Sequence, residues 1–194
     1  MSTRLPGPER RQQLLDAALE IFGIGGYAEA SMAEIARTAG ITKPVVYQHF
    51  PSKRALFLEV LGECGERLEA AIEKATANAG GPRHQVEQGF GAFVQFFSDN
   101  PAMFRTMFSD ANRSDPEFAA EVYRIEMVVA ERIAALIDID DLTESDRRLL
   151  AHGIVGMAEG ACRHWMQGTS GLDPERVGEL LAHLTWTGLR GSRR

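Results

Sequence analysis

The amino-acid sequence predicts an all-α protein with about nine helices, and three observations support this fold class. Apolar residues recur three and four positions apart along most of the 194 residues, which is the period of an amphipathic helix. Glycines, prolines and short polar residues fall between these periodic stretches, where helices start and stop. No segment resembles a strand meander. A content of 44% hydrophobic and 25% charged residues is ordinary for a globular protein with a well-buried core.

The first helix is predicted from Pro8 to Ile24, and Gly25 and Gly26 follow where it should end. Its apolar positions form a single stripe, and its polar positions face away. The stripe consists of Leu14, Leu15, Ala18, Leu19 and Phe22. A helix of this kind can pack across the two short helices that follow it and complete a three-helix domain.

Residues 31–53 predict two short helices around a tight turn. Ser31, followed three residues later by Glu34, has the form of a capping box that starts a helix, and Gly40 suits the left-handed position that ends it. Thr42 offers a second N-cap, and Pro44 is tolerated in the first turn because its missing N–H costs nothing there. The apolar inner face of the first short helix is Met32, Ile35, Ala36 and Ala39, and that of the second is Val46 and Phe50. This arrangement is a helix-turn-helix.

The outward residues of the second short helix suit contact with DNA. They include a cation, a hydroxyl-tipped aromatic ring, an amide that can bond adenine in bidentate fashion, and a small apolar group that can touch a thymine methyl. These residues are Lys43, Pro44, Val45, Tyr47, Gln48 and His49. Taken alone, two helices around a glycine turn are a modest signal, because any helical hairpin can show them.

The run AEIARTAGITKPVVYQHFPSKRAL, preceded by an amphipathic helix, resembles the DNA-binding region of the TetR family of bacterial regulators, with YQHFPSK after AGIT as its most specific part. The resemblance covers roughly the first third of the chain. It implies phosphate contacts for Thr42, Tyr47, His49 and Lys53, and positions near base edges for Lys43, Pro44, Val45 and Gln48. The sequence departs from the common pattern at Val45, where a small hydroxyl residue is frequent, so readout there is limited to apolar contact.

The charge is divided unevenly along the chain. Residues 1–60 hold 7 Lys/Arg and 6 Asp/Glu, a balance of +1, whereas residues 61–194 hold 14 and 21, a balance of −7, so the total of −6 lies outside the helix-turn-helix. Some phosphate contacts must therefore come from hydroxyls, backbone amides and helix N-termini. Arg4, Arg10 and Arg11 near the N-terminus either form a solvated tail or reach a phosphate or the minor groove.

The rest of the chain predicts further helices, the first of which links the two halves. Ser52 can cap this long helix, which reaches about Ala79 before the break at residues 79–82. The later helices carry residues 86–97, 103–108, 116–136, 143–167 and 174–189. We expect a helix-turn-helix domain over residues 1–52, and a helical domain for effector binding and dimerisation over residues 53–194.

Aromatic and methionine residues of the middle helices can line an adaptable apolar cavity, or they can be plain core. They are Phe90, Phe93, Phe97, Met103, Phe104, Met107, Phe108, Met127, Met157 and Trp165. The resemblance favours the cavity, because regulators of this family typically bind a small molecule in the C-terminal domain. It implies an apolar or amphipathic effector, with Arg105, Glu159 or His164 as polar anchors.

Three glycines share one face of the helix predicted over residues 143–167. Gly153, Gly156 and Gly160 lie at i, i+3 and i+7, although each mid-helix glycine costs roughly 1 kcal/mol relative to alanine. Close approach of another helix, inside the subunit or across a two-fold axis, is the usual compensation. The resemblance implies a homodimer formed by the last two helices, with interface residues Gly153, Gly156, Gly160, Val177, Leu180, Leu181 and Leu184.

No motif for catalysis, metal binding or cofactor binding is visible, so we expect a non-enzyme without cofactors. The five histidines are scattered, and the acidic loop at residues 138–141 lacks the glycine turn and distal Glu of a calcium loop. Cys64 and Cys162 stand far apart and fit small buried residues better than redox sensors. There is no signal peptide and no membrane-spanning run, which predicts a cytoplasmic protein.

The leading hypothesis is a homodimeric transcription regulator, a repressor, which binds a pseudo-palindromic DNA operator and is released by a small ligand. One alternative is a DNA-binding regulator controlled by a protein partner, whose C-terminal helices serve only to dimerise. Another is an enzyme or transport protein that uses an apolar helical cavity, against which the missing catalytic constellation argues.

Overall fold

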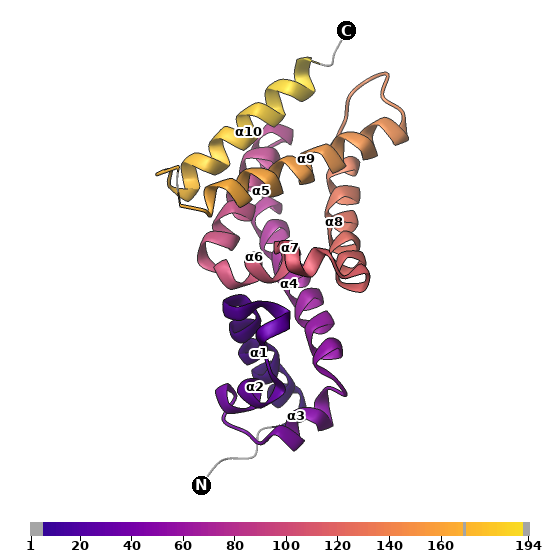
Figure 1. The fold of residues 1–194 in the computed structure, drawn as a ribbon. Helices are drawn as coiled ribbons and strands as arrows, with labels where there is room; N and C mark the ends of the chain where they lie inside the picture. The colour runs from indigo at the N-terminus through magenta and orange to yellow at the C-terminus, as the bar shows by residue number, and fades with distance from the viewer. Residues whose placement is uncertain (1–5, 169, 192–194) are drawn as a thin grey trace. The chain divides into compact units, whose positions relative to one another are not determined.

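The computed structural model describes residues 6–168 and 170–191, and within these ranges all regular structure is helical (Figure 1). The all-α prediction is confirmed. The elements are α1 (Gly7–Glu29), α2 (Met32–Thr38), α3 (Lys43–His49), α4 (Lys53–Thr76), α5 (Pro82–Asp99), α6 (Pro101–Phe108), α7 (Asp110–Arg113), α8 (Pro116–Leu136), α9 (Glu144–Trp165) and α10 (Pro174–Gly191). The four-residue helix α7 has no counterpart in the sequence prediction.

Several helices begin where the sequence predicted a cap. Ser31 Oγ accepts a hydrogen bond from the Glu34 N–H at 3.1 Å, and Ser52 Oγ accepts one from the Ala55 N–H at 3.0 Å. At α9 the Thr143 and Asp146 side chains each accept from the other's backbone N–H, which makes a full capping box. These polar contacts satisfy backbone groups that a helix start leaves unpaired.

The first helix differs from its prediction at both ends. It starts at Gly7 and continues to Glu29, with a kink at Gly26, whose φ of 73° and ψ of 175° are not helical. A residue without Cβ tolerates this conformation, so the chain bends there instead of leaving the helix. Arg10 and Arg11 therefore belong to α1 and not to a tail, while Arg4 lies outside the described residues.

The chain forms two compact units. The first contains Met1–Cys64 and Asn100–Val122, and the second contains Gly65–Asp99 and Tyr123–Arg194. Both α4 and α8 begin in the first unit and end in the second. The helix-turn-helix thus shares its packing unit with α6, α7 and the first turns of α8, and the functional boundary expected after residue 52 remains a prediction.

An aromatic cluster forms the core of the first unit. Phe22 and Phe57 meet edge to face with ring centroids 4.8 Å apart, and Phe57 lies 4.5 Å from Phe118. Helices α1 and α6 cross closely at Gly23, where a Cβ would lie 2.5 Å from the Cβ of Ala102. Any larger residue at Gly23 would push these two helices apart.

In the second unit, α10 packs along α5. A Cβ added to Gly178 would lie 3.2 Å from the Cα of Gly91, so the two backbones approach closely at this point. A second cluster of buried residues joins α8, the segment after it and α9; it consists of Ala130, Ala134, Ile137, Ile139 and Ala151.

Across the described part of the chain, no helix combines the length and the apolar character that crossing a bilayer requires.

Candidate nucleic-acid interface and apolar cavity

Helix α3 presents the outward face that the sequence predicted. Val46 at 0% and Phe50 at 1% exposure anchor it to the core of the first unit. Four of the predicted contact residues on this helix are exposed, namely Lys43, Pro44, Tyr47 and Gln48. The other two, Val45 and His49, are half-buried. A charged group, an aromatic hydroxyl and an amide thus lie on one exposed surface, which fits contact with a DNA groove.

Thr42 stands at the N-cap position of α3, but its side chain makes no cap hydrogen bond. The residue is exposed, so its hydroxyl can donate to a phosphate oxygen. Its placement suits the contact that the family resemblance implies for it.

Lys53 is placed differently from the sequence prediction. Its ammonium donates to the carbonyl oxygens of Tyr27 at 2.7 Å, Ala28 at 3.2 Å and Ala30 at 2.9 Å. It also lies 4.4 Å from the centroid of the Tyr27 ring. All three ammonium protons are therefore used at the C-terminal end of α1, where a cation is favoured by the helix dipole. The structure supports a clamp between α1 and α4, and not the phosphate contact expected for Lys53.

Arg11 has a comparable role at the C-terminal end of the recognition helix α3. Its guanidinium lies 4.3 Å from the centroid of Phe50, donates to the His49 carbonyl oxygen at 3.0 Å, and forms an ion pair with Glu59 of α4. The side chain thus fixes the C-terminal end of α3 to α1 and α4. Arg10, the other basic residue of the expected tail, donates to Gln13 Oε1 at 2.6 Å. Neither arginine lies in a free tail.

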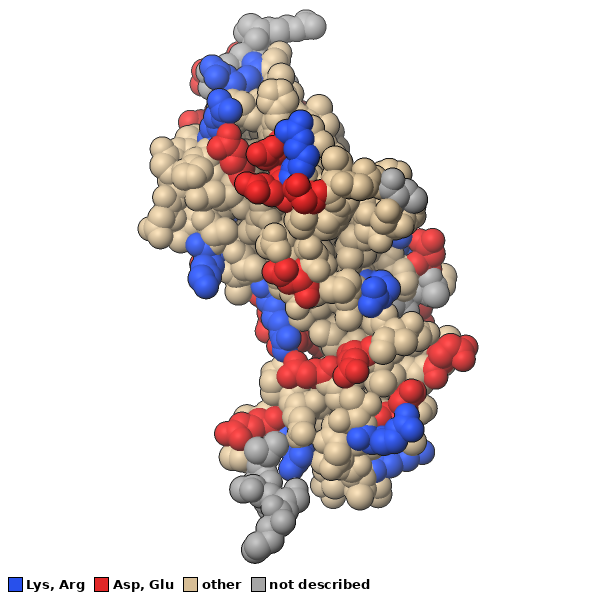
Figure 2. Space-filling view, turned by 90° about the vertical axis from the view of Figure 1, so that its left-hand side faces the viewer, with Lys and Arg blue, Asp and Glu red and all other residues tan. Residues whose placement is uncertain are grey.

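Arg37 is a candidate phosphate contact that the sequence prediction missed. It lies in the last turn of α2, its side chain is 80% exposed, and its closest carboxylate contact is Glu34 at 3.9 Å. The sequence pattern could have identified it, because residue 37 lies outside the apolar stripe of the first short helix and is therefore expected to be exposed. On the face drawn in Figure 2, blue basic and red acidic side chains are interspersed.

Two further arginines hold the later helices of the first unit. Arg54 on α4 pairs with Asp115 at 2.7 Å and with Glu117 at the start of α8, and this hydrogen bonding keeps the pKa of Asp115 below its ordinary value. Arg105 on α6 donates through Nε to the Gly23 carbonyl oxygen of α1 at 2.6 Å. The expectation that Arg105 anchors an effector is not supported, because its guanidinium is bonded to α1.

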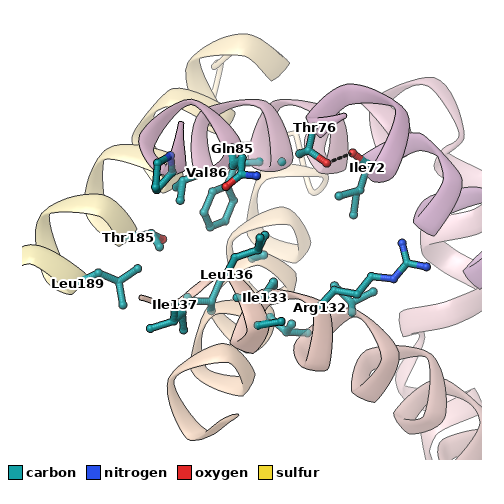
Figure 3. A pocket seen from close by; sticks show the side chains of 18 of the residues that line it. Ile72, Thr76, Gln85, Val86, Arg132, Ile133, Leu136, Ile137, Thr185 and Leu189 are labelled. Carbon is teal, nitrogen blue, oxygen red and sulfur yellow. Dashed lines mark hydrogen bonds between the residues drawn. The ribbon is translucent and has the colours of Figure 1, made fainter. Parts of the chain in front are cut away.

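The second unit contains a cavity of about 560 Å³, and its wall is mainly aliphatic and aromatic (Figure 3). Helices α4, α5, α8, α9 and α10 and the segment after α8 contribute to it. The apolar residues that line it include Ile72, Val86, Phe90, Phe93, Val129, Ile133, Leu136, Ile137, Ile139, Ile154, Val155 and Leu189. A volume of this size lies within the range of roughly 300–1,000 Å³ that small-molecule sites occupy.

Two polar residues of the cavity wall find their partners within the protein, one in ion pairs and the other in a hydrogen bond to its own helix. Arg132 pairs with Glu69 and with Glu73, the latter at 3.2 Å. Thr76 Oγ donates to the Ile72 carbonyl oxygen at 2.9 Å, the bond drawn in Figure 3.

Only part of the predicted effector site lies at this cavity. Phe90 and Phe93 line it. The Met/Phe set of α6 is buried in the first unit and does not line this cavity: Met103, Phe104, Met107 and Phe108. Phe97 is also fully buried away from the lining.

The remaining predicted residues in α8 and α9 are not among the lining residues either. Met127 and Met157 are half-buried, His164 is exposed, and Glu159 pairs with Arg163 at 2.6 Å. Trp165 uses its Nε1–H on the Leu172 carbonyl oxygen at 2.8 Å. Helical spacing identified an apolar face on each helix, but it could not say which neighbouring helix that face meets.

The predicted dimer residues divide into two groups. Gly153, Gly156 and Gly160 are exposed, and a Cβ added to any of them would meet nothing within 4 Å. Leu180 at 44% and Leu184 at 60% exposure share one face of α10, whereas Val177 and Leu181 are buried, as α10 packs on α5. The three glycines and the two exposed leucines are not covered by any helix of the described residues. Val177 and Leu181 belong to the core.

An exposed recognition helix in a three-helix domain, followed by helices that line an apolar cavity, is typical of a DNA-binding transcription regulator of the helix-turn-helix class. Residues 14–60 match the model of the bacterial regulatory proteins of the tetR family, and residues 82–188 match that of the tetracyclin repressor-like C-terminal domain. The chain belongs to the TetR family of transcription regulators. This confirms the predicted family, the DNA-binding function and the expectation that the protein is not an enzyme.

Similar proteins include both a transcriptional activator and a transcriptional repressor. The chain is 34% identical over 187 residues to the transcriptional activator FasR of Mycolicibacterium smegmatis, covering 96% of this chain and 85% of that protein. It is 29% identical over 136 residues to the repressor KstR of the same organism, covering 70% and 67%.

Two solved structures are also similar. A TetR-like regulator from Rhodococcus sp. RHA1 shares 30% identity with a TM-score of 0.79, over 97% of this chain and 100% of that one. FadR of Bacillus subtilis in complex with stearoyl-CoA has a TM-score of 0.80 at 16% identity, over 91% of this chain and 98% of that one.

Proposed function

We propose that this chain is a ligand-responsive repressor that binds a pseudo-palindromic operator in the cytoplasm as a homodimer. A small apolar or amphipathic effector, bound by the helical domain over residues 53–194, releases it from DNA. The observation that carries the proposal is the apolar cavity of about 560 Å³ in a chain that also presents an exposed recognition helix. A cavity in this domain favours control by a small molecule over control by a protein partner.

The nature of the cavity wall supports an effector with a long or bulky apolar part. Ile133, Leu136 and Val86 face the same space from α8 and α5 (Figure 3). The structurally similar FadR of Bacillus subtilis is complexed with stearoyl-CoA, which has an apolar chain of this kind. Helices α4 and α8 contribute to the wall and begin in the unit that carries α3, so an effector that changes them can change the DNA-binding unit.

The exposed face of α9 and α10 supports the homodimer. Three mid-helix glycines together cost roughly 3 kcal/mol relative to alanine, and no described part of the chain lies close enough to compensate for them. A partner helix packed on Gly153, Gly156 and Gly160 would use this close approach, and one packed on Leu180 and Leu184 would bury exposed apolar surface. Two copies of α3 held about 34–36 Å apart would then read half-sites one turn apart.

The experiment is a gel-shift titration with DNA from the region around the gene, repeated at several salt concentrations, together with analytical ultracentrifugation. We expect a dimer at micromolar concentration, binding that weakens with salt, and release by an apolar ligand that stabilises the protein against heat. A monomer at that concentration would overturn the dimer and the palindromic operator together.

Activation is the second candidate, because FasR is an activator whereas KstR is a repressor. Transcription in vitro from the bound promoter, with and without the protein, separates the two. We expect less transcript in the presence of the protein, and an increase would reverse the sign of the proposal.

A further inference from the structure

Thr185 on α10 carries a buried hydroxyl in the wall of the cavity. The residue is only 7% exposed, and its Oγ has no hydrogen-bond partner among residues 6–168 and 170–191. Figure 3 shows its side chain extending from α10 toward the space lined by Leu136 and Ile137. A buried polar group without a partner is uncommon in folded proteins, because desolvation of the group is not compensated.

Thr76, on the opposite part of the wall, shows that the usual solution is available in this cavity. Its Oγ donates to the Ile72 carbonyl oxygen four residues earlier, at 2.9 Å. A threonine inside a helix commonly satisfies its hydroxyl in this way. Thr185 also lies inside a helix, yet its hydroxyl does not make such a bond. The oxygen is shielded from the cavity in the conformation observed here, and rotation to the second χ1 rotamer that threonine adopts inside helices is what would bring it to a molecule in the cavity.

The charges of the wall indicate what kind of group that hydroxyl can meet. Four carboxylates and two guanidiniums line the cavity, a balance of −2: Glu69, Glu73, Glu126 and Asp138, against Arg132 and Arg190. Arg132 is already paired with two of the carboxylates and is 52% exposed, and Arg190 is exposed, 5.7 Å from the Trp186 ring. Neither cation is buried beside Thr185, so a carboxylate placed there would be a buried charge without compensation.

We propose that Thr185 determines effector specificity by hydrogen bonding to an uncharged oxygen of the ligand. The ligand is an apolar molecule that carries a hydroxyl, ester, thioester or amide oxygen, and a free carboxylate at that place is disfavoured. The hydroxyl of Thr185 can donate to a carbonyl oxygen or accept from an alcohol. This inference rests on the proposed effector function of the cavity and adds the chemistry of the group that it recognises.

The test uses the full chain and four probes of similar length, namely methyl dodecanoate, dodecanol, dodecanoate and tridecane, in competition with a neutral fluorescent dye. We expect the two neutral oxygen-containing probes to bind about threefold to tenfold more tightly than the hydrocarbon, after correction for their water solubility. Thr185→Val removes that advantage and leaves hydrocarbon affinity unchanged, whereas Thr185→Ser keeps it. Thr76→Val is the matched control and leaves the ratio unchanged.

The outcomes separate this inference from the proposed function. An equal loss for all probes in Thr185→Val, an equal effect of Thr76→Val, or tightest binding of the carboxylate would overturn the role of Thr185 while leaving the cavity as an effector site. A folded, DNA-binding chain that bound none of the four probes would overturn the effector site itself, and the Thr185 inference with it. Circular dichroism of each variant verifies that it is folded.

Discussion

Replacement of Lys53 by methionine distinguishes a structural clamp from a phosphate contact. The ammonium donates three hydrogen bonds to carbonyl oxygens near the end of α1, at 2.7, 2.9 and 3.2 Å. A hydrogen bond that involves a charged group contributes roughly 1.5–3 kcal/mol, but these carbonyls lie near solvent and can recruit water when the ammonium is removed. Methionine keeps much of the apolar stem, so the net loss is about 2 kcal/mol.

For a chain of this size, a loss of about 2 kcal/mol lowers the Tm by roughly 4–8 °C. Thermal unfolding followed by circular dichroism measures this shift. The slope of log K against log salt in a DNA-binding titration should stay unchanged, because an ammonium bonded to carbonyl oxygens does not neutralise a phosphate.

Arg37→Ala is the matched control for the DNA measurement. Its exposed side chain has little part in the fold, so the Tm should stay within about 1 °C, while the salt slope falls by about 0.9 if it meets one phosphate. The reasoning about Lys53 is refuted if Lys53→Met leaves the Tm unchanged and lowers the salt slope by that amount.

Four other measurements test separate parts of the structure. Gln48→Ala should relax base preference at one base pair by about 1–3 kcal/mol, measured by competition with single-base operator variants, and an unchanged preference would remove Gln48 from base readout. Leu184→Asp, on the exposed face of α10, should shift sedimentation from dimer to monomer without lowering helicity, and a persistent dimer would place the interface elsewhere. Burial raises the pKa of the Cys162 thiol to about 12, so in the native protein this thiol should react with a disulfide reagent only on unfolding; rapid labelling at pH 8 would contradict its burial. The Arg54 hydrogen bond holds the pKa of Asp115 below its ordinary value of about 4, so its stabilisation is present above that pH and is lost as the pH falls through the lowered pKa; the Tm deficit of Asp115→Asn should therefore shrink in acid, and a deficit independent of pH would argue against the ion pair.

The sequence by itself determined the elements that rest on local chemistry. Ser31, Ser52 and Thr143 cap helices as predicted, because each cap links residues only three positions apart. The outward face of α3 also followed from the sequence, since Val46 and Phe50 define which side of a short helix must be buried.

Tertiary structure alone decided where the apolar faces meet. The spacing of Met103, Phe104 and Met107 identified an apolar face on α6, but the same spacing suits a core and a cavity wall equally. Packing placed that face in the first unit and built the cavity wall of the second unit from other residues, Ile133 and Leu189 among them.

The roles of long polar side chains were likewise beyond the sequence. Lys53 bonds to carbonyl groups 23 to 26 residues away, and Arg11 to one 38 residues away, so their partners depend on how separate helices pack. Thr185 and Thr76 are the same residue type, each within a helix, yet the Thr76 hydroxyl is satisfied by its own helix and the Thr185 hydroxyl is buried without a partner among the described residues. Local sequence determines which groups need a partner, and only the packing of helices decides which of them find one.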